Sequence, residues 1–406
     1  MKSLAFVSII GGAIGAFACG GDSSGPSGPR AASVTGIAGD SQVAPTNVPL
    51  DFPLSMTLLG SNGQPIQGVS VTWSAVPANG ASFSPQPSVS DANGIAATTV
   101  TMGAIQDTIV INAAVPGVAQ PVVFHALAVD PCTFARLYTF GSTVNGALTT
   151  VDCNAGGYYT DLYAISFAAQ TGLTINMTGN FDTWIDWYHD NGSTLEPIGF
   201  HDDIAFPGNL NSRLQAVVSP GDYILAPNTA NAGVTGAYQI TSSTRAQRAS
   251  GCGELWVTRG VILADSIAAG DCPDTTGVGS YGDSLKIILL SGTVLKVAAR
   301  SGAVNPRLAL FRVIFKQPPS TDSLFLAASN DDSSGTTTNA FVSYTASQGA
   351  VFIIFAGTTG TGQTGPYTLD ISSSTTLSGA ARSNATRRTR VGALPQWPAE
   401  LELRRH

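Results

Sequence analysis

Hydrophobic and polar residues alternate along most of the chain, in short stretches separated by turns. Val69, Val71 and Trp73 fall on one side of an extended segment, and the small polar residues between them fall on the other. The run at residues 91–94, Asp-Ala-Asn-Gly, is typical of a turn. Short strands at this spacing predict a β-sandwich, and residues 32–129 form the first such unit.

Beyond that unit, one pattern occurs twice. Segments 152–167 and 271–289 both carry Asp-Cys, a glycine-bearing loop, Tyr-x-Asp and an alternating strand. Later, each copy has an Asp-Asp turn and ends on a Gly-x-Tyr strand. Two copies are too few for a solenoid. They predict two further β-domains, residues 131–246 and residues 250–375, in an all-β chain.

The two ends of the chain differ from this middle part. Residues 1–18 have a positive start and an apolar run of about 15 residues, too short to span a bilayer as a helix and typical of a signal peptide. The Ala-Phe-Ala before Cys19 resembles the bacterial lipobox, which implies that Cys19 is lipidated; ordinary secretory cleavage near Ala18 is the alternative. Residues 19–31 predict a flexible tether, and the Arg-rich residues 376–406 predict a disordered tail.

Two segments of the first unit resemble a known family. Residues 63–73 (Gly-Gln-Pro-Ile-Gln-Gly-Val-Ser-Val-Thr-Trp) and residues 90–96 (Ser-Asp-Ala-Asn-Gly-Ile-Ala) are similar to the strand pair and turn of the invasin/intimin-type bacterial Ig-like (Big-1) domain. Ser90 stands where that family usually has Thr. The resemblance implies a spacer or adhesive module rather than a catalytic one, and we expect Trp73 in its core.

Each repeat resembles the pre-peptidase C-terminal (PPC) domain, a β-sandwich or jelly-roll module. The first copy matches the family pattern at Tyr158, Tyr159, Asp161, Tyr163, Phe181-Asp182, Asp202-Asp203, Gly221-Asp222-Tyr223 and Gly236-Ala237-Tyr238. The second copy matches more weakly, at Tyr281, Asp283, Asp331-Asp332 and Gly365-Pro366-Tyr367. The family commonly accompanies secreted peptidases and assists secretion or substrate binding. The sequence shows no peptidase pattern, so the resemblance implies a stand-alone binding use.

Four further cysteines follow Cys19 in two similarly spaced pairs. An exported protein meets an oxidising compartment, which predicts the disulfides Cys132–Cys153 and Cys252–Cys272, one in each repeat. Each would close a loop of about 20 residues and contribute about 3 kcal/mol in the chain-entropy model. A four-cysteine metal site is the alternative, although no Cys-x-x-Cys pair is present.

Acidic residues gather in the first repeat. Asp186, Asp190, Asp202 and Asp203 predict a Ca²⁺ site, because Ca²⁺ takes oxygen ligands. The same Asp-Asn-Gly and Asp-Asp runs are also ordinary turns. No other cofactor is expected. His189 and His201 offer two zinc ligands without a convincing third.

Aromatic residues lie among these acids. Trp184 and Tyr188 share one side of a predicted strand and Trp187 points to the other, so one side belongs to the core and the other would present an aromatic platform to a sugar. The second repeat lacks the tryptophans and most of the acids. The sequence therefore predicts that binding resides in the first repeat.

Two serine motifs do not support catalysis. Ser23 fits Gly-x-Ser-x-Gly but lies in the tether, where no strand and helix hold it. Ser284 lies in Gly-Asp-Ser-Leu, but the only Asp-x-x-His pattern, Asp186 to His189, precedes it and belongs to the other repeat. We therefore expect no catalytic residues and no enzyme activity.

Composition limits the partners. The 406 residues are 43% hydrophobic and only 11% charged, with little Lys, which argues against nucleic acid as a partner. The net charge of −7 is mild and indicates no particular ligand. No Asp follows Cys19, so retention in the inner membrane is not indicated. The sequence predicts a non-catalytic lipoprotein, anchored to the outer membrane or cell surface, that adheres to extracellular polysaccharide or protein. A structural spacer and a hydrolase with an unrecognised site are the alternatives.

Overall fold

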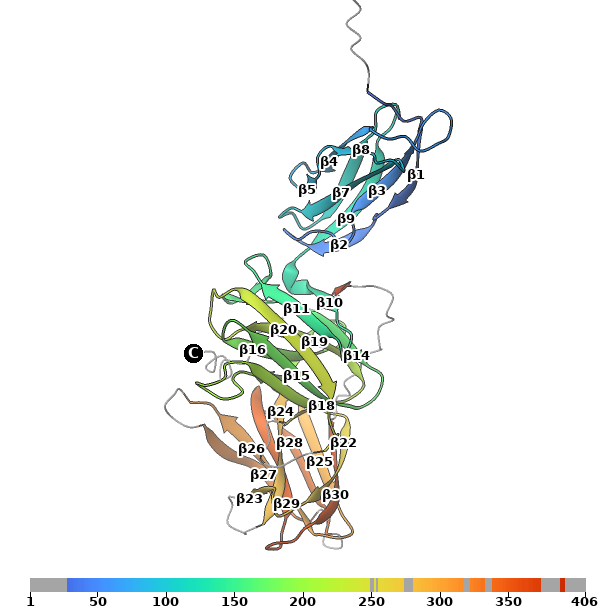
Figure 1. The fold of residues 1–406 in the computed structure, drawn as a ribbon. Helices are drawn as coiled ribbons and strands as arrows, with labels where there is room; N and C mark the ends of the chain where they lie inside the picture. The colour runs from blue at the N-terminus through green and yellow to red at the C-terminus, as the bar shows by residue number, and fades with distance from the viewer. Residues whose placement is uncertain are drawn as a thin grey trace, which may run out of the picture.

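Three β-sandwich units follow one another along the molecule in the computed structural model (Figure 1). The structure describes residues 28–248, 252, 255–273, 280–316, 322–332, 338–373 and 388–390. The Ig-like unit lies at one end, the second repeat at the other and the first repeat between them (Figure 1). This confirms the all-β prediction. The signal peptide and Cys19 lie outside the described residues.

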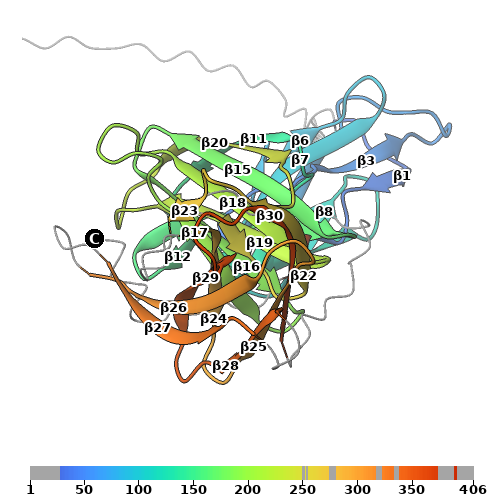
Figure 2. The same ribbon diagram turned by 90° about the horizontal axis from the view of Figure 1, so that it is seen from below.

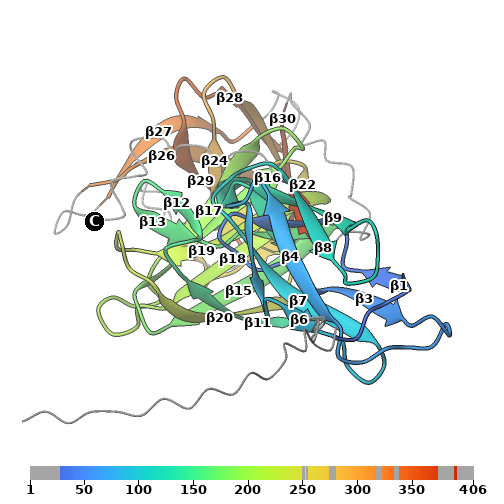
Figure 3. The ribbon, with the colours of Figure 1, turned by 90° about the horizontal axis from the view of Figure 1, so that it is seen from above.

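The Ig-like unit packs two sheets around one core, as the view along the molecule in Figure 3 shows. One sheet has the order β1 (Ser33–Ala38), β3 (Leu54–Leu59), β7 (Ile95–Met102), β5 (Ala81–Ser84). The other has the order β2 (Gln42–Pro45), β9 (Val122–Val129), β8 (Thr108–Ala114), β4 (Ser70–Val76), β6 (Ser88–Val89). Trp73 is buried, as expected, and its Nε1 donates to Ser88 Oγ at 2.8 Å. Ala31 also belongs to this core, so the unit begins at the last residue predicted for the tether, one residue before its predicted start at residue 32.

The first repeat begins with a 3₁₀ turn, η1 (Pro131–Thr133), and also has two sheets. The first sheet has the order β17 (Leu195–His201), β16 (Thr183–Asp190), β19 (Gly221–Thr229), β14 (Tyr163–Phe167), β10 (Phe134–Leu137). In addition, β13 (Tyr158–Thr160) pairs with β19, and β12 (Cys153–Ala155) pairs with β13. The second has the order β11 (Thr143–Leu148), β20 (Gly236–Thr244), β15 (Thr171–Gly179), β18 (Ser212–Val218).

The second repeat has the same strand order. Its first sheet runs β27 (Ser323–Asn330), β26 (Pro306–Ile314), β29 (Ala350–Thr358), β24 (Tyr281–Leu289), β21 (Leu255–Val257), with β23 (Cys272–Pro273) beside β24. Its second sheet runs β22 (Val261–Ile267), β30 (Gly365–Ser373), β25 (Val294–Arg300), β28 (Ala340–Thr345). The two repeats therefore correspond strand by strand, and β17 is the counterpart of β27.

Both predicted disulfides are present. Cys132 bonds to Cys153 and Cys252 bonds to Cys272, with Cα–Cα distances of 4.5 and 4.8 Å. In the first repeat the bond links the segment before β10 to β12, and in the second repeat it links the segment before β21 to β23. The paired sulfurs rule out the alternative of a four-cysteine metal site.

The two repeats share a sheet. β18 of the first repeat pairs in parallel with β21 of the second, and β21 continues to β24, so one ten-stranded sheet crosses the boundary near residue 250. Trp256 of β21 belongs to the first repeat's core, and Val217 of β18 belongs to the second's. The predicted boundary therefore separates the two repeats along the sequence, but their sheets and hydrophobic cores continue across it.

The tail differs from its prediction in one place. β31 (Arg388–Arg390) pairs antiparallel with β10, and Phe134 lies opposite Arg390. These three residues form a strand where disorder was predicted, because β10 offers them an unpaired edge. The other residues of 376–406 lie outside the described part. Within that part, no helix has the length and hydrophobicity to cross a membrane.

Candidate functional site

The predicted aromatic platform in the first repeat is buried. Trp184, Trp187 and Tyr188 are only 2%, 0% and 3% exposed. Trp187 stacks on Tyr223 in the main core, with ring centroids 5.5 Å apart. Trp184 stacks on Phe200 with ring centroids 5.3 Å apart. The prediction of a sugar platform here is therefore corrected: these rings hold the core together.

Contact between the two repeats explains this difference. Phe200, which covers Trp184, contacts Trp256 of the second repeat at a centroid distance of 5.2 Å. On the same side of β16, Tyr188 lies in a separate buried cluster with Ile224. The alternating pattern places Trp184 and Tyr188 on the face of β16 opposite to Trp187, but neighbouring elements cover both faces, and Trp184 joins the same buried cluster as Trp187.

Two of the four predicted calcium ligands serve the local structure instead. Asp186 accepts hydrogen bonds from Trp184 Nε1 at 2.6 Å and Asn228 Nδ2 at 3.0 Å. Asp190 accepts from the backbone N–H of Gly192 at 2.8 Å and so holds the turn after β16. Both carboxylates are buried. The structure therefore does not group them with Asp202 and Asp203.

Asp202 and Asp203 converge instead with Asp182. One carboxylate oxygen from each lies within 4.8 Å of the others, the one such group of potential metal ligands that the described residues contain. The β16–β17 hairpin explains the meeting, because its antiparallel register sets the start of β16 beside the end of β17. We call these three residues the acidic trio.

The electrostatics of the acidic trio suit a hard cation. Burial raises the pKa of Asp182 and of Asp203, and the charge of Asp182 raises the pKa of Asp203 further. Asp182 Oδ2 accepts from Asn231 Nδ2 at 3.3 Å, whereas Oδ1 of Asp182 and Oδ1 of Asp203 are buried without a hydrogen-bond partner among the described residues. Ca²⁺ binding stays a prediction, with Asp182 in place of Asp186 and Asp190.

We expect Ca²⁺ to raise the melting temperature of the full chain through the acidic trio. With a Kd on the order of 0.1 mM, typical of extracellular modules, about 10 mM Ca²⁺ would add about 2.7 kcal/mol of stability. Asp203→Asn should remove most of that gain, and Asp331→Asn, at the matching turn of the second repeat, should keep it. Calorimetry with and without Ca²⁺ measures the shift. An equal gain in both variants would place the ion elsewhere, and no gain in the wild type would exclude the site.

A buried Asp–Tyr pair occurs at the same place in both repeats. Tyr238 Oη donates to Asp161 Oδ2 at 2.5 Å, and Tyr367 Oη donates to Asp283 Oδ2 at 2.7 Å. Burial raises the pKa of Asp161 to about 6, although the nearby Arg136 opposes the rise. The repetition marks a structural element of the fold. It also gives Asp283, the Asp of Gly-Asp-Ser-Leu, a structural partner.

His189 is fully buried, and neither of its ring nitrogens has a hydrogen-bond partner among the described residues. Its ring meets Tyr223 edge to face, with centroids 5.3 Å apart. Burial lowers the pKa of His189, and the positive charge of Arg259 lowers it further. The native protein therefore holds a neutral imidazole in its core.

Replacing His189 should flatten the dependence of stability on acid. Below about pH 6.5 the unfolded chain binds a proton at His189, whereas the native state, in which the pKa of His189 is lowered, binds it only at lower pH. This residue therefore makes the native state less stable as pH falls. Asp161, whose raised pKa acts in the opposite direction, is unchanged in the variant. The free energy of unfolding of His189→Phe, relative to that of the wild type, should therefore be higher at pH 5 than at pH 7.5, as measured by denaturant unfolding. A difference in stability between His189→Phe and the wild type that does not change with pH would contradict the assignment.

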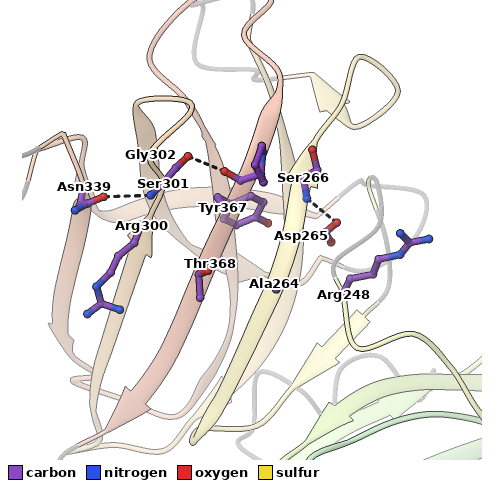
Figure 4. A pocket seen from close by; sticks show the side chains of 11 residues that line it. Arg248, Ala264, Asp265, Ser266, Arg300, Ser301, Gly302, Asn339, Tyr367 and Thr368 are labelled. Atoms are coloured by element: carbon purple, nitrogen blue, oxygen red, sulfur yellow. Dashed lines mark hydrogen bonds between the residues drawn. The ribbon is translucent and has the colours of Figure 1, made fainter.

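A shallow depression of about 720 Å³ lies on the second repeat, across β22, β30 and β25. Figure 4 shows Arg300 on one side and Arg248 on the other, with Tyr367 and Asp265 between them. We call it the second-repeat groove. Its lining consists of Arg248, Ala264, Asp265, Ser266, Arg300, Ser301, Gly302, Asn339, Pro366, Tyr367 and Thr368.

The groove combines charged and hydrogen-bonding side chains with apolar surface. Asp265 Oδ1 accepts from the N–H of Ser266 at 2.8 Å, while Oδ2 is buried without a partner among the described residues. Burial raises the pKa of Asp265, which Arg248 opposes. Arg300 Nη1 lies 3.7 Å from Asp370 Oδ2. This ion pair is largely exposed, so it contributes little to fixing the position of the Arg300 side chain. Sequence reasoning missed this groove, since its residues come from strands far apart in the chain.

Comparisons with known proteins add little. No protein-family model matches the chain, and no curated protein matches it. One solved structure with some similarity is described as "The Triple Jelly Roll Fold and Turret Assembly in an Archaeal Virus"; it shares 10% identity over 86% of this chain and 85% of that chain, with a TM-score of 0.18. A likeness this low carries no argument. The fold itself defines an all-β protein of sandwich units with two disulfides.

Proposed function

We propose that the chain is a non-catalytic lipoprotein of the bacterial envelope, and that it binds a carboxylate-bearing polysaccharide in the second-repeat groove. The observation that carries the proposal is the pair Arg248 and Arg300 on either side of one groove. The groove belongs to the unit farthest from the N-terminal end of the described chain (Figure 1). A lipid on Cys19, as its lipobox-like context implies, would hold that end at the outer membrane or cell surface.

The chemistry of the groove favours a sugar acid over other ligands. Guanidinium groups bind carboxylates through paired, charge-assisted hydrogen bonds. The polar residues Ser266, Asn339 and Thr368 also line the groove and would form hydrogen bonds with sugar hydroxyls. A shallow, open groove accommodates a segment of a polymer.

Two features support a non-catalytic role in this proposal. Ser284 lies in β24 of the second repeat, whereas His189 is buried in the first. The resemblances to Big-1 and PPC modules also imply adhesion or binding. A structural spacer is the second candidate, since three units in a row separate the two ends of the molecule. A pure spacer would bind no glycan.

Arg300→Gln should weaken binding of the full chain to polygalacturonate about tenfold, since a hydrogen bond to a charged group is worth about 1.5–3 kcal/mol. Added salt should weaken wild-type binding as well. Titration calorimetry measures both effects, with dextran as the uncharged polymer. Arg213→Gln, at an exposed arginine of the first repeat, is the matched control and should bind like the wild type. Equal binding by Arg300→Gln and Arg213→Gln would show that the glycan does not bind in the second-repeat groove. The absence of binding to any charged glycan would favour a spacer function.

A further inference from the structure

Large apolar side chains are exposed on the β26–β27 hairpin of the second repeat. Ile314, Leu324, Phe325 and Leu326 are 38%, 53%, 61% and 45% exposed, and we call them the hairpin patch. Neighbouring residues of a strand point to opposite faces. Exposure of three in succession therefore means that both faces of this half of β27 are uncovered. The hairpin projects from the body of the repeat (Figures 1 and 2).

β27 is also an edge strand. Among the described strands it pairs only with β26, so the backbone N–H and C=O groups on its other side have no strand partner. The strand carries no charged residue within Ser323–Asn330. A long, uncharged, apolar edge is the kind of surface that pairs with another strand.

The first repeat shows what happens at the equivalent strand. In β17, the apolar residues Leu195, Ile198 and Phe200 are all buried. The second repeat closes this side, since Trp256 Nε1 donates to the Phe200 carbonyl at 3.0 Å and Arg259 pairs with Glu196. The same side of the second repeat faces no third repeat among the described residues. The repeated architecture thus covers this edge once and leaves it open once.

We propose that the β27 edges of two copies of this chain pair antiparallel and form a symmetric dimer. A two-fold axis through Phe325 places Leu324 of each copy opposite Leu326 of the other, so the hairpin patch covers itself. With no charge in β27, self-pairing brings no like charges together. The ten-stranded sheet would then continue across the axis. This inference does not depend on the proposed function, because the groove lies on the other sheet.

The dimer is tested by the mass of the full chain in sedimentation velocity over about 1–100 μM, with twice the single-chain mass expected at the upper end. Phe325→Lys sets two like charges face to face at the axis and should leave a monomer with unchanged thermal unfolding. Val123→Lys, at an exposed position of the Ig-like unit, is the control and should still dimerise. In addition, Phe325→Cys should form a disulfide between copies under mild oxidation, whereas Val123→Cys should not.

Three results would overturn the proposal. A monomer at every concentration would show that the edge has no such partner. A dimer that persists in Phe325→Lys would place the interface elsewhere. A ladder of species larger than the dimer would show an open-ended contact in place of the two-fold one. If Phe325→Lys fails to fold, the Phe325→Cys cross-link decides alone.

Discussion

Trp256→Ala is expected to lower the free energy of unfolding by about 3–5 kcal/mol. The ring is buried and comes from the second repeat, yet it packs in the first repeat's core against Phe200. Its fit is close: a Cβ on Gly199 would lie 2.9 Å from the ring, so no larger residue fits there without a shift. Removing the indole leaves a cavity at the junction that neither repeat can fill alone.

The same variant should also uncouple the two repeats. In the wild type, we expect the repeats to unfold together in urea, because they share a sheet and exchange core residues. Trp256→Ala should give two transitions, resolved by hydrogen exchange within each repeat. Trp73→Ala, a comparable cavity in the Ig-like unit, should destabilise that unit and leave the repeats coupled. A Trp256→Ala protein that keeps one transition and loses less than about 1 kcal/mol would contradict the shared core.

Arg259→Met is expected to lower the free energy of unfolding by about 3–5 kcal/mol at neutral pH, because it leaves the carboxylate of Glu196 buried without its positively charged partner. The two side chains are 8% and 14% exposed and pair across the repeats. Burial raises the pKa of Glu196, and Arg259 opposes that rise. Without the arginine the pKa rises further, so the penalty is present above the new pKa and is relieved as acid protonates the carboxyl. The variant should therefore lose less stability at pH 5 than at pH 7.5.

A double variant provides the control for this ion pair. Glu196→Gln combined with Arg259→Met removes both charges and should recover much of the loss. The pH dependence that remains comes from His189, whose pKa the charge of Arg259 no longer lowers. Denaturant unfolding of the four proteins in the cycle measures the coupling. If Arg259→Met and the double variant are equally stable at both pH values, the carboxylate of Glu196 is not stabilised by the charge of Arg259, which would contradict this prediction.

Local patterns predicted the elements and the bonds within each repeat. The alternation around Val71 and Trp73 predicted a strand with a buried side, and β4 has that pattern. The matched spacing of the cysteines predicted both disulfides. These inferences succeeded because strand periodicity and short covalent loops depend on residues close in sequence.

Contacts between distant segments could not be predicted in this way. The pattern set Trp184 and Trp187 on opposite sides of one strand and left one side free for a ligand, whereas Phe200, packed against Trp256 of the second repeat, covers Trp184 in the structure. Likewise, the register of the β16–β17 hairpin decides that Asp182, and not Asp186, meets Asp203. The residues around the groove were missed for the same reason.

The central claim is that the second repeat, and not the first, holds the ligand. Amide hydrogen exchange of the full chain, with and without saturating polygalacturonate, tests it most directly. The account predicts slower exchange in β22, at the start of β30 and at the end of β25, which line the groove. Protection confined to β16, β17 and the acidic trio, with no change in the second repeat, would contradict it.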